Sequence, residues 1–222
     1  MRPREFQIAV IASALTLILF RLLFNGMSAR GAGQSVSIEP LDARLTITYF
    51  ISDGAGVPGY RSSDRELAEW ALQTWQRTSP KTLRFESSQE SDAVVRLYWA
   101  GPETGQFGEM RSLEVGKRRG AAVFIRPDLP SLGPEIERRA TSDDLLRDTV
   151  VYLTCMHELG HAMGLEHTRN FADIMYYFGY GGDVAQFFGR YRALLHTRAD
   201  IARNSGLSAS DVERMKLMYG RE

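Results

Sequence analysis

The sequence contains few cysteines and few histidines. A single cysteine, Cys155, stands among 222 residues, which excludes a disulfide framework, a zinc site built from cysteines and an iron–sulfur cluster. A lone cysteine is most often a small buried core residue, and we expect this of Cys155. An excess of charge of one sign is also missing, since 27 basic residues face 27 acidic ones. Without a basic surface, the chain is not expected to bind nucleic acid.

The longest apolar run is at the N-terminus. Residues 6–24 contain one charged side chain, Arg21, whose guanidinium can extend to the membrane surface. The run is long enough to span a bilayer, so we expect an uncleaved transmembrane anchor within residues 1–24. A cleaved signal peptide and secretion are the alternative, although Met27-Ser28-Ala29 fits a cleavage site poorly. Both interpretations predict an extracytoplasmic domain, because the arginines before the run favour a cytoplasmic N-terminus.

We expect one folded domain, residues 41–222, preceded by a flexible linker of small and polar residues at 25–40. Runs of β-branched and aromatic residues predict strands, and a Gly- and charge-rich loop is expected up to Arg119. Capping-box sequences, Ser63 with Glu66 and Thr141 with Asp144, open two segments of helical spacing. The expected helices are 63–78 and 143–163, and the expected strands are 45–51, 83–86, 93–100 and 120–125, the last of them at a sheet edge.

Three of the four histidines lie within eleven residues. His157 and His161 are four residues apart, so their imidazoles leave the same face of the predicted helix and can bind one ion. Glu158 is rotated off that line and can reach a water at the metal. Gly164 suits a left-handed residue that ends the helix, after which His167 can return as a third ligand. Three neutral imidazoles leave a fourth position for water, as in catalytic zinc sites.

With the glycine and the third histidine at these spacings, the motif resembles that of the metzincin metallopeptidases, and within them the matrixin-like peptidases. The resemblance implies that His157, His161 and His167 bind Zn²⁺ and that Glu158 is the general base. Ala172-Asp173-Ile174-Met175-Tyr176 is similar to the Met-turn of the family, which implies that Met175 forms an apolar floor under the zinc. The alternative is that these are histidines on an ordinary helix without a metal. The short motif from His157 to His161 alone could arise by chance, but the third histidine at a fixed spacing makes this far rarer.

The resemblance covers residues 41–222 and implies an α+β, zincin-like fold. Its parts are a mixed twisted sheet, an active-site helix, a Met-turn and a C-terminal helix. Ser208 with Asp211 forms a capping box where the C-terminal helix is expected to begin.

Three features depart from the matrixin pattern, and calcium binding is a separate open point. Tyr177 stands where matrixins usually have proline, and by resemblance to astacins and serralysins it could support the oxyanion, with a core or rim tyrosine as the alternative. Cys155 lies inside the active helix, so a cysteine-switch propeptide is not expected. Only His196 is left for a second, structural zinc, which is therefore not expected. Calcium stays open, but no Asp-rich loop of the EF-hand type supports it.

Residues 178–206 exceed what the resemblance requires, and we treat them as an insertion. In matrixins this region shapes the pocket for the residue after the scissile bond. The insertion is therefore expected either to narrow or cover that pocket or to pack on the domain. Its apolar residues fall at helical spacing and predict an amphipathic helix: Val184, Phe187, Phe188, Tyr191, Leu194 and Leu195.

These features predict a zinc metalloendopeptidase that hydrolyses peptide bonds with a zinc-activated water and Glu158 as general base. The expected partner is a peptide or protein substrate lying antiparallel along an edge strand. That strand is expected to contain Gly120, Ala121, Ala122, Val123 and Phe124. The alternative is a catalytically inactive, zinc-bearing binding module at the membrane. Glu158 argues against this alternative, because a site without catalysis needs no base there.

Overall fold

The computed structural model of the chain describes residues 38–79, 83–104 and 107–220, so the anchor expected at 1–24 and most of the linker expected at 25–40 lie outside the described residues. No helix in the described part is both long and apolar enough to cross a bilayer. The helices and strands are β1 (Ile47–Ile51), α2 (Asp64–Thr78), β2 (Phe85–Ser87), β3 (Val95–Trp99), β4 (Gly108–Val115), β5 (Arg118–Ile125), α3 (Pro134–Ser142), α4 (Asp144–Ala162), α5 (Val184–Arg192) and α6 (Ala209–Tyr219).

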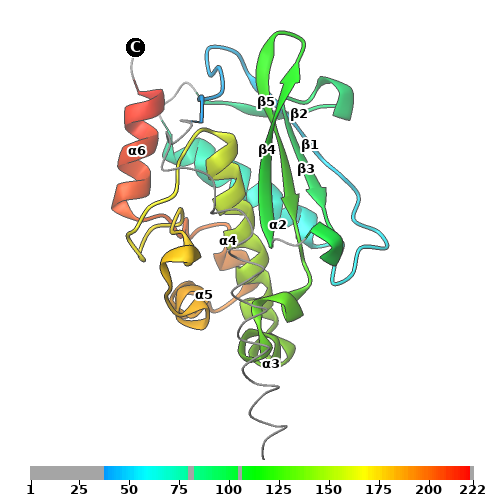
Figure 1. The fold of residues 1–222 in the computed structure, drawn as a ribbon, viewed down its shortest axis with the longest axis vertical. Coiled ribbons are helices and arrows are strands. Elements are labelled where there is room, and N and C mark those ends of the chain that lie inside the picture. Colours follow the sequence, from blue (N-terminus) through cyan, green and yellow to red (C-terminus); the bar gives the residue numbers. More distant parts are fainter. Residues whose placement is uncertain (1–37, 80–82, 105–106, 221–222) are drawn as a thin grey trace, which may run out of the picture. The chain divides into compact units, whose positions relative to one another are not determined.

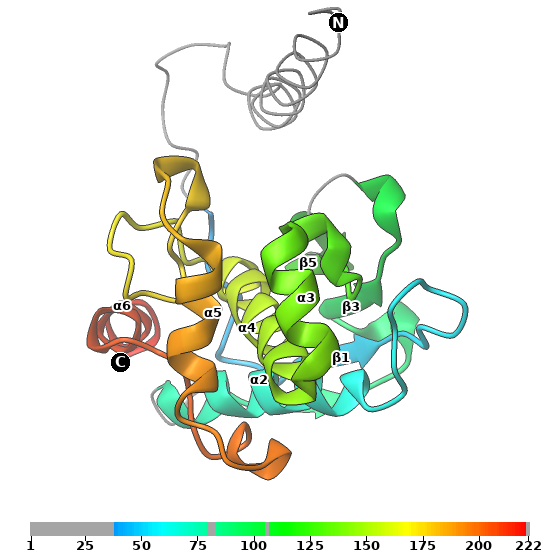
Figure 2. The ribbon, with the colours of Figure 1, turned by 90° about the horizontal axis from the view of Figure 1, so that it is seen from below.

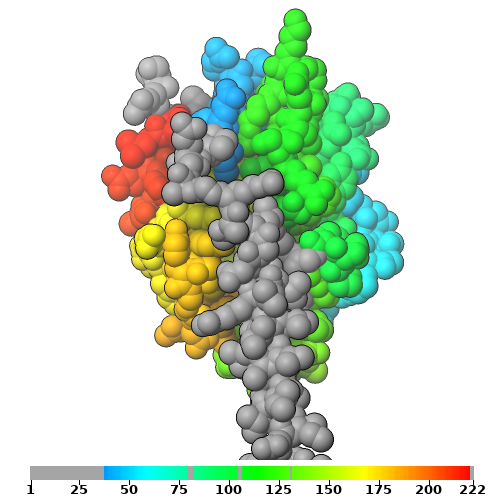
Figure 3. Space-filling model, viewed as in Figure 1, coloured from blue at the N-terminus to red at the C-terminus, as the bar shows by residue number. Residues whose placement is uncertain are grey.

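A five-stranded mixed sheet forms one layer of this domain, with the strand order β2-β1-β3-β5-β4 (Figure 1). β1 pairs in parallel with β2 and β3, and β3 pairs in parallel with β5. β4 runs antiparallel to β5, and the turn between them projects from the surface (Figure 3). Side chains alternate along the strands, so Leu97 and Val123 are buried while Tyr98 and Phe124 on the other face are partly exposed. The mixed sheet with its helices confirms the expected α+β fold.

Helix α4 lies between the sheet on one side and α5 and α6 on the other (Figures 1 and 2). It packs on α2 and on strands β4 and β5. The indole Nε1 of Trp75 in α2 donates a hydrogen bond of 3.0 Å to the Met156 carbonyl of α4. Trp75, Tyr152 and Met156 are fully buried, which holds the helix rigidly in the core.

Residues 108–115 form strand β4, where a loop was expected, and this changes the edge of the sheet. β5 pairs on both sides, with β3 and with β4, so it is not an edge strand. The prediction of an edge at Gly120, Ala121, Ala122, Val123 and Phe124 is therefore wrong. β4 has the glycine and charged residues typical of a loop because one edge and one face of the strand are open to solvent.

Two of the expected capping boxes are absent. Ser63 makes no side-chain hydrogen bond at the start of α2. Thr141 belongs to α3, a helix that was not predicted, where its hydroxyl donates to the Glu137 carbonyl. Asp143 caps α4 instead, by accepting a hydrogen bond of 3.1 Å from the Leu146 amide. The local sequence pattern suits several capping positions, and the break between α3 and α4 selects one of them.

The inserted segment contains the expected helix, α5, and it packs on the domain. The buried side of this helix carries Phe187, Phe188 and Tyr191. The ring of Tyr191 stacks on Tyr152 of α4 with 5.6 Å between the ring centroids. Arg192 forms an ion pair of 2.9 Å with Asp143, the cap of α4. Within the insertion, α5 therefore supports the first half of the active-site helix.

Candidate zinc site

The last two turns of α4 present His157 and His161, and Gly164 follows the helix end at Ala162 by two residues. Gly164 has a backbone φ of +106°, which side chains other than glycine rarely adopt. A β-carbon there would also lie 3.1 Å from the backbone of Pro40. Both the conformation and the space require glycine, so the chain can turn sharply and return to the helix with His167.

The three histidine side chains converge on one point. The Nε2 atom of His167 lies 3.2 Å from Nε2 of His157 and 3.1 Å from Nε2 of His161. Zinc bound tetrahedrally at about 2.0 Å requires nitrogens about 3.3 Å apart, so the spacing fits this ion. Among the described residues, these three form the group of side chains able to hold a metal.

Backbone carbonyls select the tautomer of two histidines. Nδ1 of His157 lies 2.7 Å from the Ile174 carbonyl, and Nδ1 of His161 lies 2.7 Å from the Leu165 carbonyl. Since a carbonyl oxygen only accepts, each Nδ1 carries the proton and each Nε2 offers a lone pair to the metal. The hydrogen bonds thus prepare both rings as ligands.

The electrostatic environment keeps the imidazoles neutral. Burial, with the neighbouring His161, lowers the pKa of His157 to about 3 and that of His167 to about 4. Burial also lowers the pKa of His161, and the charge of Arg214 lowers it further. Neutral imidazoles are the form that binds zinc, so the site is ready for the metal at neutral pH.

Met175 lies directly beneath the ligand-bearing turn of α4. It is fully buried, and a β-carbon at Gly160 would overlap its sulfur atom. The same β-carbon would lie 3.3 Å from the ring of Trp75. Gly160 therefore lets Met175 approach the helix backbone closely, and its role as a floor under the metal stays a prediction.

Glu158 follows His157 in α4 and is buried, with 7% of the residue exposed. Burial, and next the charge of Glu109, raises the pKa of Glu158 to about 8. A divalent cation held by the histidines would oppose this shift and favour the carboxylate. The carboxyl group packs against Gly108 at the start of β4, where a β-carbon would overlap it. Gly108 thus leaves the space that Glu158 occupies.

Tyr177 stacks on His167. Its ring centroid lies 4.7 Å from that of His167, with an angle of 30° between the planes. Tyr180 meets the Tyr177 ring edge-on at 5.3 Å, and Gly179 leaves room for the ring because a β-carbon there would overlap it. Tyr177 is 36% exposed, so it lies at the rim of the site rather than in the core.

Two other residues considered from the sequence do not belong to the group of three histidines. Cys155 is fully buried, as expected, and burial raises the pKa of its thiol well above the ordinary value. His196 is exposed, and its amide donates to Asp200 near the short helical turn after α5. Two residues that touch the site were missed: Gly108, because its segment has a loop-like composition, and Arg214, for which the sequence carries no signal.

Comparisons with known proteins agree with this geometry. The model of the family described as Matrixin matches residues 42–186. The chain is 30% identical over 112 residues to the macrophage metalloelastase of Rattus norvegicus. This alignment covers 48% of the chain and 22% of that protein. It is 28% identical over 169 residues to stromelysin-2 and 26% identical over 164 to stromelysin-1 of the same organism, each covering 72% of the chain and 29% of the relative. The chain therefore spans less than a third of the length of these relatives.

Proposed function

The chain belongs to the matrixin family of metallopeptidases, and from this premise we propose that it is a zinc-dependent metalloendopeptidase. The observation that carries the proposal is the convergence of three Nε2 atoms, at 3.1 and 3.2 Å, next to a buried glutamate. His157, His161 and His167 would hold one Zn²⁺, with a position open toward solvent. A closed structural site would need a fourth protein ligand, and no such residue stands beside the three in the part of the chain that the structure describes.

The bound metal would supply a Lewis acid that activates water and polarises the scissile carbonyl. Glu158 would take the proton from the attacking water and return it to the nitrogen of the leaving amine. The carboxyl group is buried next to the histidines, and the bound cation would favour its carboxylate form, which can accept the proton. The histidine tautomers stay unchanged throughout, since both Nδ1 protons are bound to carbonyls.

The substrate would lie along β4 instead of along the residues expected from the sequence. β4 is the end strand of the sheet, and no described strand pairs with its outer edge, so an extended peptide could pair there. Gly108, the first residue of β4, lies against the Glu158 carboxyl group. A peptide added to β4, antiparallel to it, would therefore pass directly over the zinc ligands. Attachment to a membrane through residues 6–24 stays a prediction from the sequence.

Tyr177 would act by stacking on His167 and not through its hydroxyl group. Under this proposal, Tyr177→Phe keeps the ring contact at 4.7 Å and retains kcat within about fivefold of the unmodified protein. Tyr177→Ala removes the contact and lowers kcat further, because His167 loses the ring that orients it. A fall of about 10² or more in kcat for Tyr177→Phe would instead identify the hydroxyl as an oxyanion donor.

The proposal is tested by measuring zinc and cleavage on one preparation of the full chain. We expect one zinc ion per chain and cleavage of internal peptide bonds in a peptide library, abolished by a chelator and by a hydroxamate. The alternative function is a zinc-bearing binding module without catalysis. Stoichiometric zinc with no cleavage of any library member would favour that alternative and overturn the peptidase proposal.

A further inference from the structure

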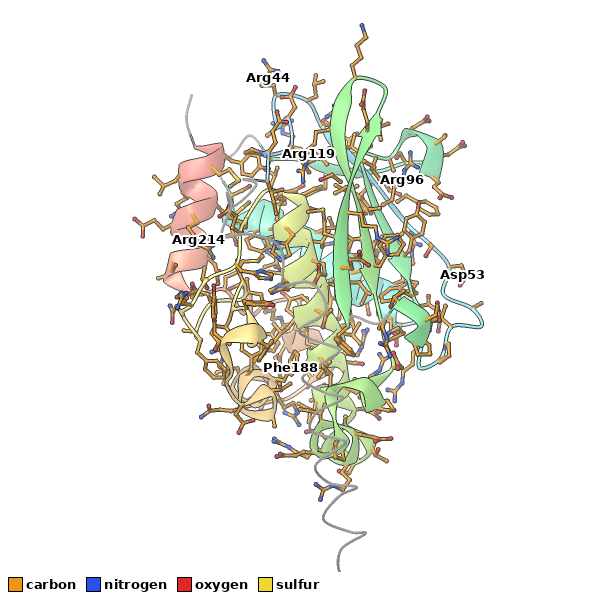
Figure 4. The ribbon with its side chains drawn as sticks, viewed as in Figure 1. Arg44, Asp53, Arg96, Arg119, Phe188 and Arg214 are labelled. Carbon is orange, nitrogen blue, oxygen red and sulfur yellow. The ribbon has the colours of Figure 1, made fainter. Side chains whose placement is uncertain are left out.

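Arg214 connects parts of the chain that carry two different zinc ligands. It extends from α6, the last helix, toward the loop after α4 (Figure 4). One guanidinium nitrogen, Nη1, donates a hydrogen bond of 3.0 Å to the carbonyl of Glu166, the residue before His167. The other, Nη2, donates at 2.8 Å to Oδ1 of Asp211. The two arms of a single guanidinium thus hold the His167 segment and a buried carboxylate at a fixed separation.

Asp211 continues the connection to the other side of the site. Its second oxygen, Oδ2, accepts a hydrogen bond of 2.8 Å from the amide of Ile174 in the Met-turn. The carbonyl of the same residue, Ile174, accepts the Nδ1 proton of His157 at 2.7 Å. A continuous path of hydrogen bonds therefore runs from His157 through the Met-turn, Asp211 and Arg214 to the segment of His167.

Charge gives a second reason for an arginine at this place. Asp211 is fully buried and Asp173 is 1% exposed, and Arg214 pairs with the first at 2.8 Å and with the second at 4.0 Å. Arg190 also acts on these two carboxylates, but its own hydrogen bonds go to the carbonyls of Phe171 and Ala172. Removing Arg214 would leave the buried Asp211 carboxylate without the arginine that hydrogen-bonds to it, so the carboxylate would be displaced.

We propose that Arg214 is a positioning residue of the zinc site, which fixes His157 and His167 relative to one another through Asp211 and the Met-turn. The inference rests on the proposed zinc-binding function but concerns the affinity for the metal, which can be measured without any substrate. Partners that orient metal ligands from outside commonly contribute about 10- to 100-fold to affinity. We therefore expect Arg214→Met to weaken zinc binding by about 10- to 100-fold.

The test compares three variants of the full chain by competition for Zn²⁺ with a chelating dye, and by the visible spectrum of the Co²⁺ form. Arg214→Lys keeps the charge but has one arm, so its zinc affinity should lie between those of Arg214→Met and the unmodified protein. Arg192→Met is the matched control, since the Arg192 side chain is 27% exposed against 26% for Arg214 and also forms an ion pair. It should lower stability while leaving the zinc affinity and the Co²⁺ spectrum unchanged.

The outcomes separate this inference from the proposed function. Zinc affinity and Co²⁺ spectrum unchanged in both Arg214 variants would overturn the positioning role, whatever the peptidase activity. An equal loss of affinity in Arg192→Met would overturn it as well, because the effect would then reflect general loosening of the domain. Conversely, a protein that binds zinc and loses affinity on Arg214→Met, yet cleaves no peptide, would support the inference and overturn the peptidase proposal.

Discussion

Glu158→Gln is expected to retain zinc and to lower kcat/KM by about 10³-fold or more. The amide has nearly the same size as the carboxyl group, so it fills the space beside Gly108 without disturbing the three histidines. It cannot accept a proton from water, and the step proposed for Glu158 is therefore lost. The measurement is zinc content by atomic absorption together with initial rates on a cleaved library peptide.

The matched control for this variant is Glu213→Gln, because Glu213 is an exposed glutamate on α6. It changes the net charge by the same amount and should leave both zinc content and kcat/KM within about twofold. Activity near that of the unmodified protein in Glu158→Gln would contradict the assignment of the base. Loss of zinc in Glu158→Gln would instead show that the carboxyl group supports the ligands, and the loss of rate would then not report on proton transfer.

The convergence of the three histidines could be predicted from the sequence because their geometry is local. His157 and His161 share one helical face by their spacing alone, and Gly164 and His167 follow within six residues of the second histidine. The positive φ of Gly164 could be expected as well, because glycine adopts such a conformation readily and often ends a helix in this way. Local spacing and local conformation together determine where the three histidine side chains lie.

The surroundings of the site depend on contacts between segments far apart in the sequence. Gly108 lies against Glu158 only because β4 pairs with β5. The residues next to Gly108 in the sequence do not indicate this pairing. Arg214 reaches Glu166 across 48 residues of chain, and the pattern of α6 would be equally helical without an arginine there. Residue spacing carries no information on such pairs, which is why the edge strand was misplaced and Arg214 was missed.

The largest expected effect on stability comes from Asp64, which anchors the first turn of α2 to the first turn of α4. Its carboxylate is fully buried and receives both arms of Arg147, with 2.6 Å between Nη2 and Oδ2. Arg147 also donates at 2.7 Å to the Gly59 carbonyl. Asp64→Ala would remove the bidentate partner of the buried guanidinium and leave it, among carboxylates, only the longer contact of 3.4 Å with Asp148, so we expect the free energy of unfolding to fall by about 3–5 kcal/mol. Urea denaturation of the zinc-loaded protein measures this change.

Two further variants separate the cost of a broken pair from the value of the pair itself. Replacing both partners, as Asp64→Leu with Arg147→Met, leaves no buried charge unpaired and should recover most of the loss, because desolvation offsets much of the attraction within a buried ion pair. The exposed pair between Arg61 and Asp144, with side chains 47% and 79% exposed, provides the matched control. Asp144→Ala should lower the free energy of unfolding by less than about 1 kcal/mol. A loss in Asp64→Ala as small as that in Asp144→Ala would contradict this expectation, because it would mean that Asp148 or water replaces Asp64 at Arg147. The two helices would then be held together by other contacts, such as the hydrogen bond from Trp75 to the Met156 carbonyl.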